Sequence, residues 1–263
     1  MYKMIVLDLD GTLLNSDSIV SKKNKWMIEK CREQGLKIVL ASGRMYYSMD
    51  PIIKELQLEE DSHIGGNGAI IFSLQGYVKI VSALENRVYR NLIGKIKKEN
   101  IQLLSYSKEN IYYDYAPQLS HLILNFQDVE LTQVKSVMQL KNIIKVVLYV
   151  KDKERDKEER IRDIIKNHAA VFRSHKSFLD IVHHSTNKYR AIEGLMQQYK
   201  IHPREVIAIG DSENDVEMIK NVGLGVAMPN GSEEAKKAAK YIAPKTNNED
   251  GVADILERFV VND

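Results

Sequence analysis

The N-terminal region contains a short apolar run, Met4-Ile5-Val6-Leu7, that ends in the acidic turn Asp8-Leu9-Asp10-Gly11. Four consecutive apolar residues predict a strand buried on both faces. Because glycine lets the backbone turn and approach a ligand closely, both carboxylates can converge at the end of this strand. Two such carboxylates repel each other unless a cation or a proton lies between them. One interpretation is a divalent metal site with Asp8 available as a nucleophile and Asp10 as a proton donor and acceptor; the other is a solvated Asp-Gly turn.

The composition indicates an ordinary globular chain. Its 263 residues are enough for one large domain or two smaller ones with a core that needs no disulfides. Lys and Arg (38) nearly balance Asp and Glu (36), so the global charge gives no argument for nucleic acid or an anionic membrane as partner. The single cysteine, Cys31, excludes a disulfide framework. No apolar stretch approaches the roughly 18 residues of a membrane span, and a cytoplasmic location is therefore expected.

The first segment predicts a βαβ unit, with strands at 4–7 and 36–40 around a helix at 23–34. Such a crossover makes the two strands parallel, so their carboxyl ends meet at one edge of the sheet. Asp8 and the segment Ala41-Ser42-Gly43-Arg44 should therefore share this edge. A helix over about 45–56 and a glycine-rich turn at 64–69 follow.

The middle of the chain has a different pattern. Helical stretches at 84–99 and 153–167 alternate with short runs of β-branched and aromatic residues, such as Lys145 to Val150 and Phe178 to Val182. Adjacent strand signals joined by short turns predict antiparallel hairpins, and hence an α+β insert. The strand and helix alternation resumes after Lys188.

These patterns predict an α/β fold: a Rossmann-like parallel-sheet core domain built from both ends of the chain, with an inserted α+β cap domain. The predicted core domain comprises residues 1–83 and 185–263, and the predicted cap comprises residues 84–184. The cap is expected to lie above the ligand-binding edge of the core sheet.

A second acidic cluster narrows the interpretation of the first one. The apolar strand Val206 to Ile209 is followed by Gly210-Asp211, with Asp215 four residues further on. Two parallel strands that each end in an acid pair bring four carboxylates to one edge. This arrangement favours a hard-cation site, and Mg²⁺ suits it because a few carboxylates leave coordination positions for water and a substrate phosphate.

Several motifs occur in order along the chain, and together they resemble the haloacid dehalogenase-like hydrolases, specifically the Cof-type phosphatases with a large α/β cap. The resemblance covers essentially the whole chain. It rests on Asp8-Leu9-Asp10-Gly11-Thr12-Leu13-Leu14, Ala41-Ser42-Gly43-Arg44, Asn67-Gly68-Ala69, Lys188, Gly210-Asp211-Ser212-Glu213-Asn214-Asp215, Gly223-Leu224-Gly225-Val226-Ala227-Met228 and Thr246-Asn247-Asn248-Glu249-Asp250-Gly251.

The resemblance implies a role for each matching residue. Asp8 would attack phosphorus to give an aspartyl phosphate, and Asp10 would protonate the leaving oxygen and then activate water. The metal would be held by Asp8, the carbonyl oxygen of Asp10, and Asp211, with Asp215 orienting the site. The phosphoryl oxygens would be bound by the Leu9 and Gly43 N–H groups, Ser42, Lys188 and Asn214.

Some positions leave alternatives open. Ser42 can instead cap the helix that begins near Met45, and Arg44 can fix its loop or pair with an acid. Asn67 and Gly68 can shape a turn or contact substrate. The sequence departs from the family pattern at Ser185 and Tyr189, where glycines are usual, and Tyr189 is a candidate for the substrate entrance. In the cap, the candidates for determining substrate specificity are Arg173, His175, Lys176 and Asp180.

The predicted activity is Mg²⁺-dependent hydrolysis of small phosphorylated metabolites, either sugar phosphates or phosphorylated cofactors, through an aspartyl-phosphate intermediate. A sugar phosphomutase-like phosphotransferase is the first alternative, and a non-enzymatic phospho-aspartate regulatory module is the second. The expected partner is a small phosphorylated metabolite, with no nucleic acid and no membrane, and the protein is expected to be a monomer or homodimer.

Overall fold

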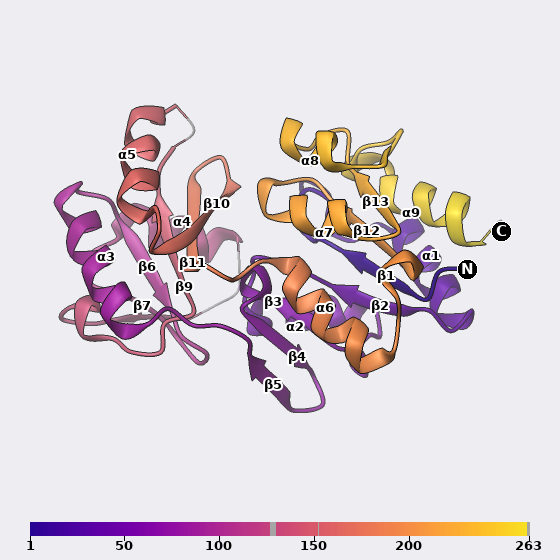
Figure 1. The fold of residues 1–263 in the computed structure, drawn as a ribbon, viewed down its shortest axis with the longest axis horizontal. Helices are drawn as coiled ribbons and strands as arrows, with labels where there is room; N and C mark the ends of the chain where they lie inside the picture. The colour runs from indigo at the N-terminus through magenta and orange to yellow at the C-terminus, as the bar shows by residue number, and fades with distance from the viewer. Residues whose placement is uncertain (127–129, 152, 262–263) are drawn as a thin grey trace. The chain divides into compact units, whose positions relative to one another are not determined.

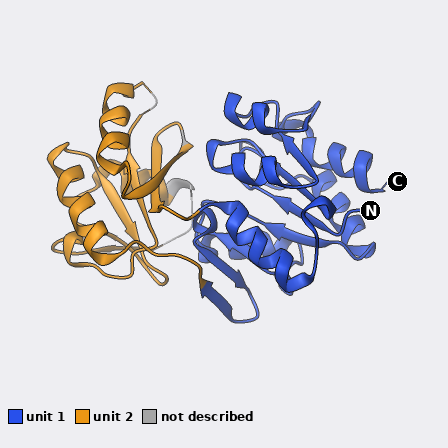
Figure 2. Ribbon diagram, viewed as in Figure 1, with its two compact units in different colours: residues 1–79, 187–263 blue, residues 80–186 orange. Residues whose placement is uncertain are grey.

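The computed structural model describes residues 1–126, 130–151 and 153–261. The chain divides into two compact units, which Figure 2 shows in different colours. The core unit comprises residues 1–79 and 187–263, and the cap unit comprises residues 80–186. The chain thus enters the cap unit once and returns from it once.

The core unit alternates strands and helices along the chain (Figure 1). Its elements are β1 (Met4–Leu7), α1 (Lys22–Glu33), β2 (Lys37–Leu40), α2 (Tyr46–Glu55), β3 (His63–Gly65), β4 (Ile70–Ser73), β5 (Tyr77–Ile80), α6 (Lys188–Tyr199), β12 (Val206–Gly210), α7 (Val216–Asn221), β13 (Leu224–Ala227), α8 (Glu233–Ala238), β14 (Tyr241–Ile242) and α9 (Gly251–Leu256).

The central sheet of the core unit has five parallel strands in the order β14-β13-β12-β1-β2. Every residue of β1 and β12 is buried, as expected for parallel strands with both faces covered. On one face, Met4 and Val6 of β1 pack in a cluster with Ile192 of α6 and Ile219 of α7. Burial of these apolar side chains on both faces of the sheet stabilises the strands that the apolar runs form.

The strand register brings the predicted site residues together. Leu7, the last residue of β1, pairs with Leu40 of β2 on one side and with Ile209 of β12 on the other. Asp8 and Asp211 therefore follow neighbouring parallel strands at the same edge of the sheet. The carboxyl edge of an open α/β sheet is where ligands bind.

A smaller antiparallel sheet, in the order β3-β4-β5, continues from this edge. Ala41, which follows β2, makes an isolated parallel bridge with Ile64 of β3. Between β3 and β4 lies the short 3₁₀ turn Gly66–Gly68. This turn therefore lies close to the segment that follows β2.

The cap unit contains a six-stranded sheet in the order β10-β11-β9-β6-β7-β8. Helices α3 and α5 pack on an apolar cluster that includes Ile93, Leu148 and Ile161. The elements are α3 (Asn86–Lys98), β6 (Leu103–Tyr106), β7 (Ile111–Tyr113), α4 (Pro117–Phe126), β8 (Leu131–Gln133), β9 (Lys145–Tyr149), α5 (Arg155–Ile165), β10 (Ala169–His175) and β11 (Phe178–His183).

The predicted fold class is confirmed: a parallel-sheet core is combined with an α+β cap. One detail of the cap differs from the expected antiparallel hairpins, because β7 and β8 pair in parallel. Parallel neighbours need a crossover connection, and α4 supplies it here. The sequence prediction did not include α4.

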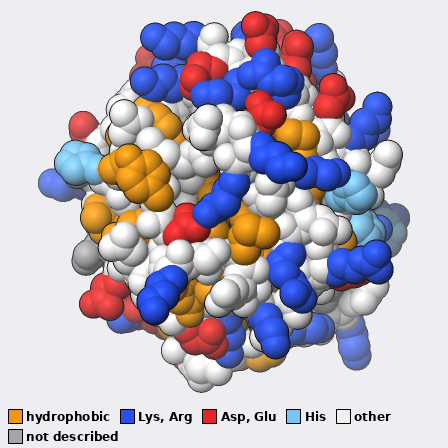
Figure 3. All heavy atoms as spheres, turned by 90° about the vertical axis from the view of Figure 1, so that its left-hand side faces the viewer, with side chains coloured by type: hydrophobic (Ala, Val, Ile, Leu, Met, Phe, Trp, Pro, Cys, Tyr) orange, Lys and Arg blue, Asp and Glu red, His pale blue; other side chains and the backbone are white. Residues whose placement is uncertain are grey.

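Near the C-terminal end of the core unit, α9 ends at Leu256 and a π-helical turn covers Glu257–Val261. Within the described residues, no helix combines the length and the apolar character that a membrane crossing requires. On the face drawn in Figure 3, Lys and Arg side chains are interspersed with Asp and Glu and with small apolar areas. Pairs such as Arg162 with Glu158 in α5 show the same mixture of charges in the cap unit.

Candidate active site

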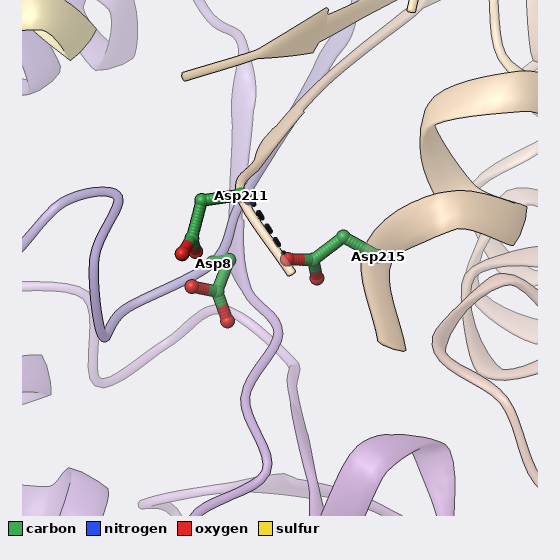
Figure 4. A group of neighbouring side chains, drawn as sticks. All are labelled: Asp8, Asp211 and Asp215. Carbon is green, nitrogen blue, oxygen red and sulfur yellow. Dashed lines mark hydrogen bonds between the residues drawn. The ribbon is translucent and has the colours of Figure 1, made fainter. Parts of the chain in front are cut away.

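Three carboxylates converge at the carboxyl edge of the core sheet, as Figure 4 shows. Asp8 follows β1, Asp211 follows β12, and Asp215 immediately precedes α7. One oxygen from each of the three carboxylates lies within 4.8 Å of the others. The two acidic motifs of the sequence thus form one cluster in the structure.

Lys188 lies against this cluster. It is the first residue of α6, whose N-terminus is capped by the side chain of Asn187. Its Nζ atom lies 2.6 Å from Asp8 Oδ1 and 2.6 Å from Asp215 Oδ1. The Lys188 and Asp215 side chains have no solvent exposure at all, so this is a fully buried ammonium–carboxylate arrangement. Removing such charges from water is costly unless they compensate each other, as they do here.

Burial and mutual repulsion shape the electrostatics of the cluster. Burial raises the pKa of Asp8 well above its usual range, against the effect of Lys188, and the Asp215 and Asp211 carboxylates raise it further. Burial, followed by the charge of Asp215, raises the pKa of Asp211 to about 6. Burial alone works to lower the pKa of Lys188, but the Asp215 and Asp8 carboxylates outweigh it and raise that pKa. The cluster therefore has an excess of negative charge that a further cation would relieve.

Asp215 orients the loop that carries Asp211. Its Oδ2 atom accepts hydrogen bonds of 3.0 Å from the backbone N–H groups of Asp211 and Ser212. Because its Oδ1 atom is bound to Lys188, Asp215 links the strand end, the start of α7 and the lysine. The supporting role of Asp215 in a metal site stays a prediction.

Asp211 is held by two hydroxyl groups, neither of which was predicted from the sequence. Thr12 Oγ1 donates to Asp211 Oδ1 at 3.0 Å, and Ser212 Oγ donates to Asp211 Oδ2 at 3.1 Å. Thr12 is fully buried although it lies in a turn, and its position two residues after Asp10 was the signal available in the sequence. Gly11 has a φ of +84°, and a Cβ atom there would lie 2.5 Å from Asp211 Oδ2.

The oxygen donors of Asp8 and Asp211 suit a hard divalent cation. Among the described residues, no hydrogen-bond donor reaches Asp8 Oδ2, while Asp8 Oδ1 is bound to Lys188. The buried Asp8 carboxylate, the partly buried Asp211 carboxylate and the close approach of Gly11 to Asp211 therefore fit a metal ion such as Mg²⁺.

The Asp10 carboxylate is bound by Arg44. Arg44 donates to both of its oxygens, from Nε to Oδ2 at 2.8 Å and from a terminal nitrogen to Oδ1 at 2.6 Å. The Asp10 side chain is half exposed, whereas Arg44 is almost buried. Of the alternatives for Arg44, the structure thus shows pairing with an acid, and the acid is the predicted proton donor.

The segment after β2 carries the next predicted phosphate ligands. Ser42 is buried, and its hydroxyl accepts a hydrogen bond of 3.1 Å from the Arg44 N–H. The alternative that Ser42 caps α2 is wrong, since the N-cap residue is Met45 and it makes no side-chain cap bond. Leu9 and Gly43, predicted to donate backbone N–H groups, lie in the loops after β1 and β2.

Asn214 contacts the glycine-rich turn of the core unit. Its Nδ2 group donates to Asn67 Oδ1 at 2.8 Å, and Asn67 is fully buried. Asn214 Oδ1 is also buried, and no hydrogen-bond partner for it is found in the described part of the chain. The turn residue Asn67, for which the sequence left two roles open, is thus joined to a predicted phosphate ligand.

Ser185 and Tyr189, the two positions that depart from the family pattern, contact neighbouring side chains of the protein. Ser185 Oγ lies 2.8 Å from His183 Nδ1, within the return segment. Tyr189 packs against the apolar cluster of the core sheet. The residue therefore contributes to the core, and the idea that it lines a substrate entrance stays a prediction.

Two of the cap candidates are engaged in ion pairs. Arg173 pairs with Glu158, and Asp180 is buried with Lys145 Nζ at 3.2 Å. Ser174 donates a further bond to Asp180 Oδ1. Lys176 is exposed, and the His175 side chain lies outside the described part of the chain. The engaged pairs stabilise the cap unit and leave substrate contacts in the cap as a prediction.

Comparison with known proteins gives the same assignment as the motifs. Residues 5–256 match the family described as haloacid dehalogenase-like hydrolase. A putative phosphatase of Haemophilus influenzae is 29% identical over 98% of both chains. In Bacillus subtilis, 5-amino-6-(5-phospho-D-ribitylamino)uracil phosphatase YitU is 26% identical over 97% of both chains.

A solved structure and a longer relative complete the comparison. The crystal structure of a haloacid dehalogenase-like hydrolase from Bacteroides thetaiotaomicron is 32% identical, with a TM-score of 0.84 over 98% of this chain and 99% of that one. The chain spans only 46% of the length of Endoribonuclease YBEY, chloroplastic, from Arabidopsis thaliana, to which it is 29% identical. The predicted family and the prediction of a hydrolytic enzyme are confirmed. The chain belongs to the haloacid dehalogenase-like hydrolase family.

Proposed function

We propose that this protein is a Mg²⁺-dependent phosphatase that hydrolyses small phosphorylated metabolites through an aspartyl-phosphate intermediate. The main support is the position of Lys188, whose buried ammonium lies 2.6 Å from Asp8 Oδ1 beside the Asp211 and Asp215 carboxylates. A nucleophilic carboxylate, a fixed cation and a set of oxygen ligands at one point are the parts that phosphoryl transfer requires.

In the first step, an oxygen of Asp8 attacks phosphorus as the bond to the leaving oxygen breaks. Asp10 gives its proton to that oxygen, so the leaving group departs as a neutral alcohol. Lys188, Ser42 and Asn214, with the N–H groups of Leu9 and Gly43, bind the equatorial phosphoryl oxygens, where negative charge is concentrated.

In the second step, Asp10 takes a proton from water, and the resulting oxygen attacks phosphorus and releases inorganic phosphate. Asp8 is then free, and Asp10 carries a proton for the next cycle. The two bonds from Arg44 fix the orientation of the Asp10 carboxylate. Mg²⁺ would be held by Asp8, the Asp10 carbonyl and Asp211, and it would offset the negative charge of the phosphoryl group against Asp8.

The substrate class in this proposal is a sugar phosphate or a phosphorylated cofactor. The named activity of the Bacillus subtilis relative YitU, which removes phosphate from a ribityl-substituted uracil, is compatible with this class. A cytoplasmic enzyme fits the free, buried thiol of Cys31. We expect a monomer or homodimer with no nucleic-acid partner.

A phosphate-release assay tests the proposal. The wild-type protein is incubated with a panel of phosphorylated metabolites and 4-nitrophenyl phosphate, with Mg²⁺ and with EDTA. We expect release only with the metal, and a loss of about 10³-fold or more in Asp8→Asn and Asp10→Asn. Asp17→Asn, in the same loop but without a predicted role, is the matched control. Full activity in a folded Asp8→Asn protein would refute the mechanism.

The same assay separates the two alternatives. A phosphomutase would move phosphate between positions of a sugar bisphosphate without releasing it. A regulatory module would accumulate a stable aspartyl phosphate at Asp8 with negligible turnover. Steady release of inorganic phosphate contradicts both.

A further inference from the structure

The turn Gly66–Gly68 joins β3 to β4 in the core unit, and its central residue has an unusual conformation. Asn67 has φ 60° and ψ 26°, in the left-handed region, and it is fully buried. Asparagine is more tolerant of this region than most residues, but glycine adopts it at less cost. The conformation of the turn alone therefore does not explain why a buried polar side chain occupies this position.

The backbone of this turn is bonded to the segment that carries Ser42. The Asn67 N–H donates to the Ser42 carbonyl oxygen at 3.0 Å, and the Gly66 N–H donates to the Arg44 carbonyl oxygen at 2.8 Å. These bonds fix the turn against the backbone of the predicted phosphate loop.

The same turn also packs against the start of α6. A Cβ atom on Gly68 would lie 2.2 Å from the Asn187 carbonyl oxygen and 3.0 Å from the Lys188 nitrogen. This approach is possible only for glycine, so the turn lies directly against the residue that supplies the buried ammonium.

The third contact is through the Asn67 side chain. Asn67 Oδ1 accepts one of the two Nδ2 hydrogens of Asn214, at 2.8 Å. Among the described residues, Asn214 Oδ1 is a buried acceptor without a partner. This hydrogen bond fixes the plane of the Asn214 amide group. The second Nδ2 hydrogen and the Oδ1 atom of Asn214 are then available to a ligand.

We propose that Asn67 is a positioning residue that fixes the Asn214 amide for binding a phosphoryl group, while its turn holds the Ser42 and Lys188 segments in register. This inference rests on the proposed phosphatase function and adds to it a residue that does not itself bind substrate. The phosphoryl oxygen accepts the remaining Nδ2 hydrogen, and Asn214 Oδ1 accepts from a hydroxyl or a water molecule beside it.

The test uses variants that separate the side chain from the backbone. Asn67→Gly removes the amide and retains the left-handed conformation. Asn100→Gly is the matched control, since Asn100 also has a positive φ, of 53°, but is exposed in the cap unit. Asn214→Ala and the double variant complete a cycle. Asn67→Ser, whose hydroxyl is too short to reach Asn214, replaces Asn67→Gly if urea unfolding shows that the glycine variant does not fold.

Two readouts are measured for each protein in the presence of Mg²⁺: the Kd for inorganic phosphate by calorimetry, and kcat and KM for 4-nitrophenyl phosphate. We expect Asn67→Gly and Asn214→Ala each to raise Kd and KM by about tenfold, with kcat changed less than KM. The Kd and KM of the double variant should be no higher than those of Asn214→Ala, because Asn67 acts through Asn214. Asn100→Gly should match the wild type.

Two results would overturn the inference. One is a Kd of Asn67→Gly equal to that of the wild type. The other is a double variant whose fold-increase in Kd is the product of the increases in the two single variants. Failure of the proposed function gives a different result. In that case the wild-type protein releases no phosphate from any ester, while the calorimetric cycle still reports whether Asn67 positions Asn214.

Discussion

The Nζ atom of Lys188 lies 2.6 Å from Oδ1 of Asp8, and both side chains are buried at the edge of the core sheet. Asp215 is equally close to the same ammonium, and Asp211 adds a third carboxylate. Lys188 is thus the cation that allows an acidic cluster to be buried in the absence of metal.

The first prediction follows from this role of Lys188. Lys188→Met should lower the free energy of unfolding by about 3–5 kcal/mol, because it leaves buried carboxylates without a partner. The loss should be larger in EDTA than in millimolar Mg²⁺, since a bound divalent cation replaces part of the missing charge. Urea unfolding under both conditions measures it. Lys220→Met, at an exposed position of α7, should change stability by less than about 0.5 kcal/mol.

The second prediction concerns Gly11, where a Cβ atom would lie 2.5 Å from Asp211 Oδ2. Gly11→Ala should weaken Mg²⁺ binding by about tenfold or more, because the Asp211 carboxylate must move. Titration of activity against Mg²⁺ concentration measures the effect. Gly35→Ala is the control: its φ of +81° is close to the +84° of Gly11, but nothing lies within 4 Å of the added Cβ.

Both alanine variants should lose about 1–2 kcal/mol of stability from the left-handed backbone. Only Gly11→Ala should change the metal requirement. An unchanged Mg²⁺ titration in a folded Gly11→Ala protein would show that Asp211 does not hold the metal.

The third prediction concerns the paired bonds from Arg44 to Asp10. Arg44→Lys should reduce kcat/KM by about 10–100-fold, because an ammonium cannot donate the two parallel bonds that fix this carboxylate. The loss should be greater for an alkyl phosphate than for 4-nitrophenyl phosphate, whose leaving group needs less help from a proton donor. Equal losses for both substrates would mean that Arg44 acts on binding and not on Asp10.

The fourth prediction concerns His63, the buried first residue of β3, which contacts β2 and the loop after α2. Its Nδ1 atom accepts from the Leu40 N–H at 3.2 Å, and its Nε2 atom lies 2.9 Å from the Leu58 carbonyl oxygen. Burial lowers the pKa of His63 below its ordinary value of 6.5, so the folded state favours the neutral ring. Its contribution to stability is complete above pH 6.5 and declines as the pH falls from there toward the lowered pKa.

Urea unfolding of the wild type and His63→Gln between pH 8 and 5.5 checks this sign. The wild type should be more stable than His63→Gln at pH 8, by about 1–3 kcal/mol, because two backbone groups lose their partner. The difference should shrink as the pH falls. His168→Gln, at an exposed position, should leave the pH dependence unchanged. A difference that grows toward low pH would contradict the assignment of a neutral ring.

The sequence was sufficient for the architecture of the core. The apolar runs that form β1 and β12 could be recognised because both faces of a parallel strand are buried, and an acidic turn after each run located the ligand edge. In the cap, the parallel pair β7 and β8 and the helix α4 between them were not predicted. The reason is that short strands do not encode in their own residues which neighbour they will pair with.

The sequence by itself therefore determined the family, the α/β core and the convergence of Asp8 with Asp211, since strand order and residue type suffice for these. Only the tertiary structure decided the partners: Arg44 for Asp10, Thr12 for Asp211 and Asn67 for Asn214. The physical reason is that a hydrogen bond depends on ångström-scale distances between side chains that are, in the case of Thr12 and Asp211, 199 residues apart in the chain. Residue patterns place such groups on a common edge, and packing selects which of them touch.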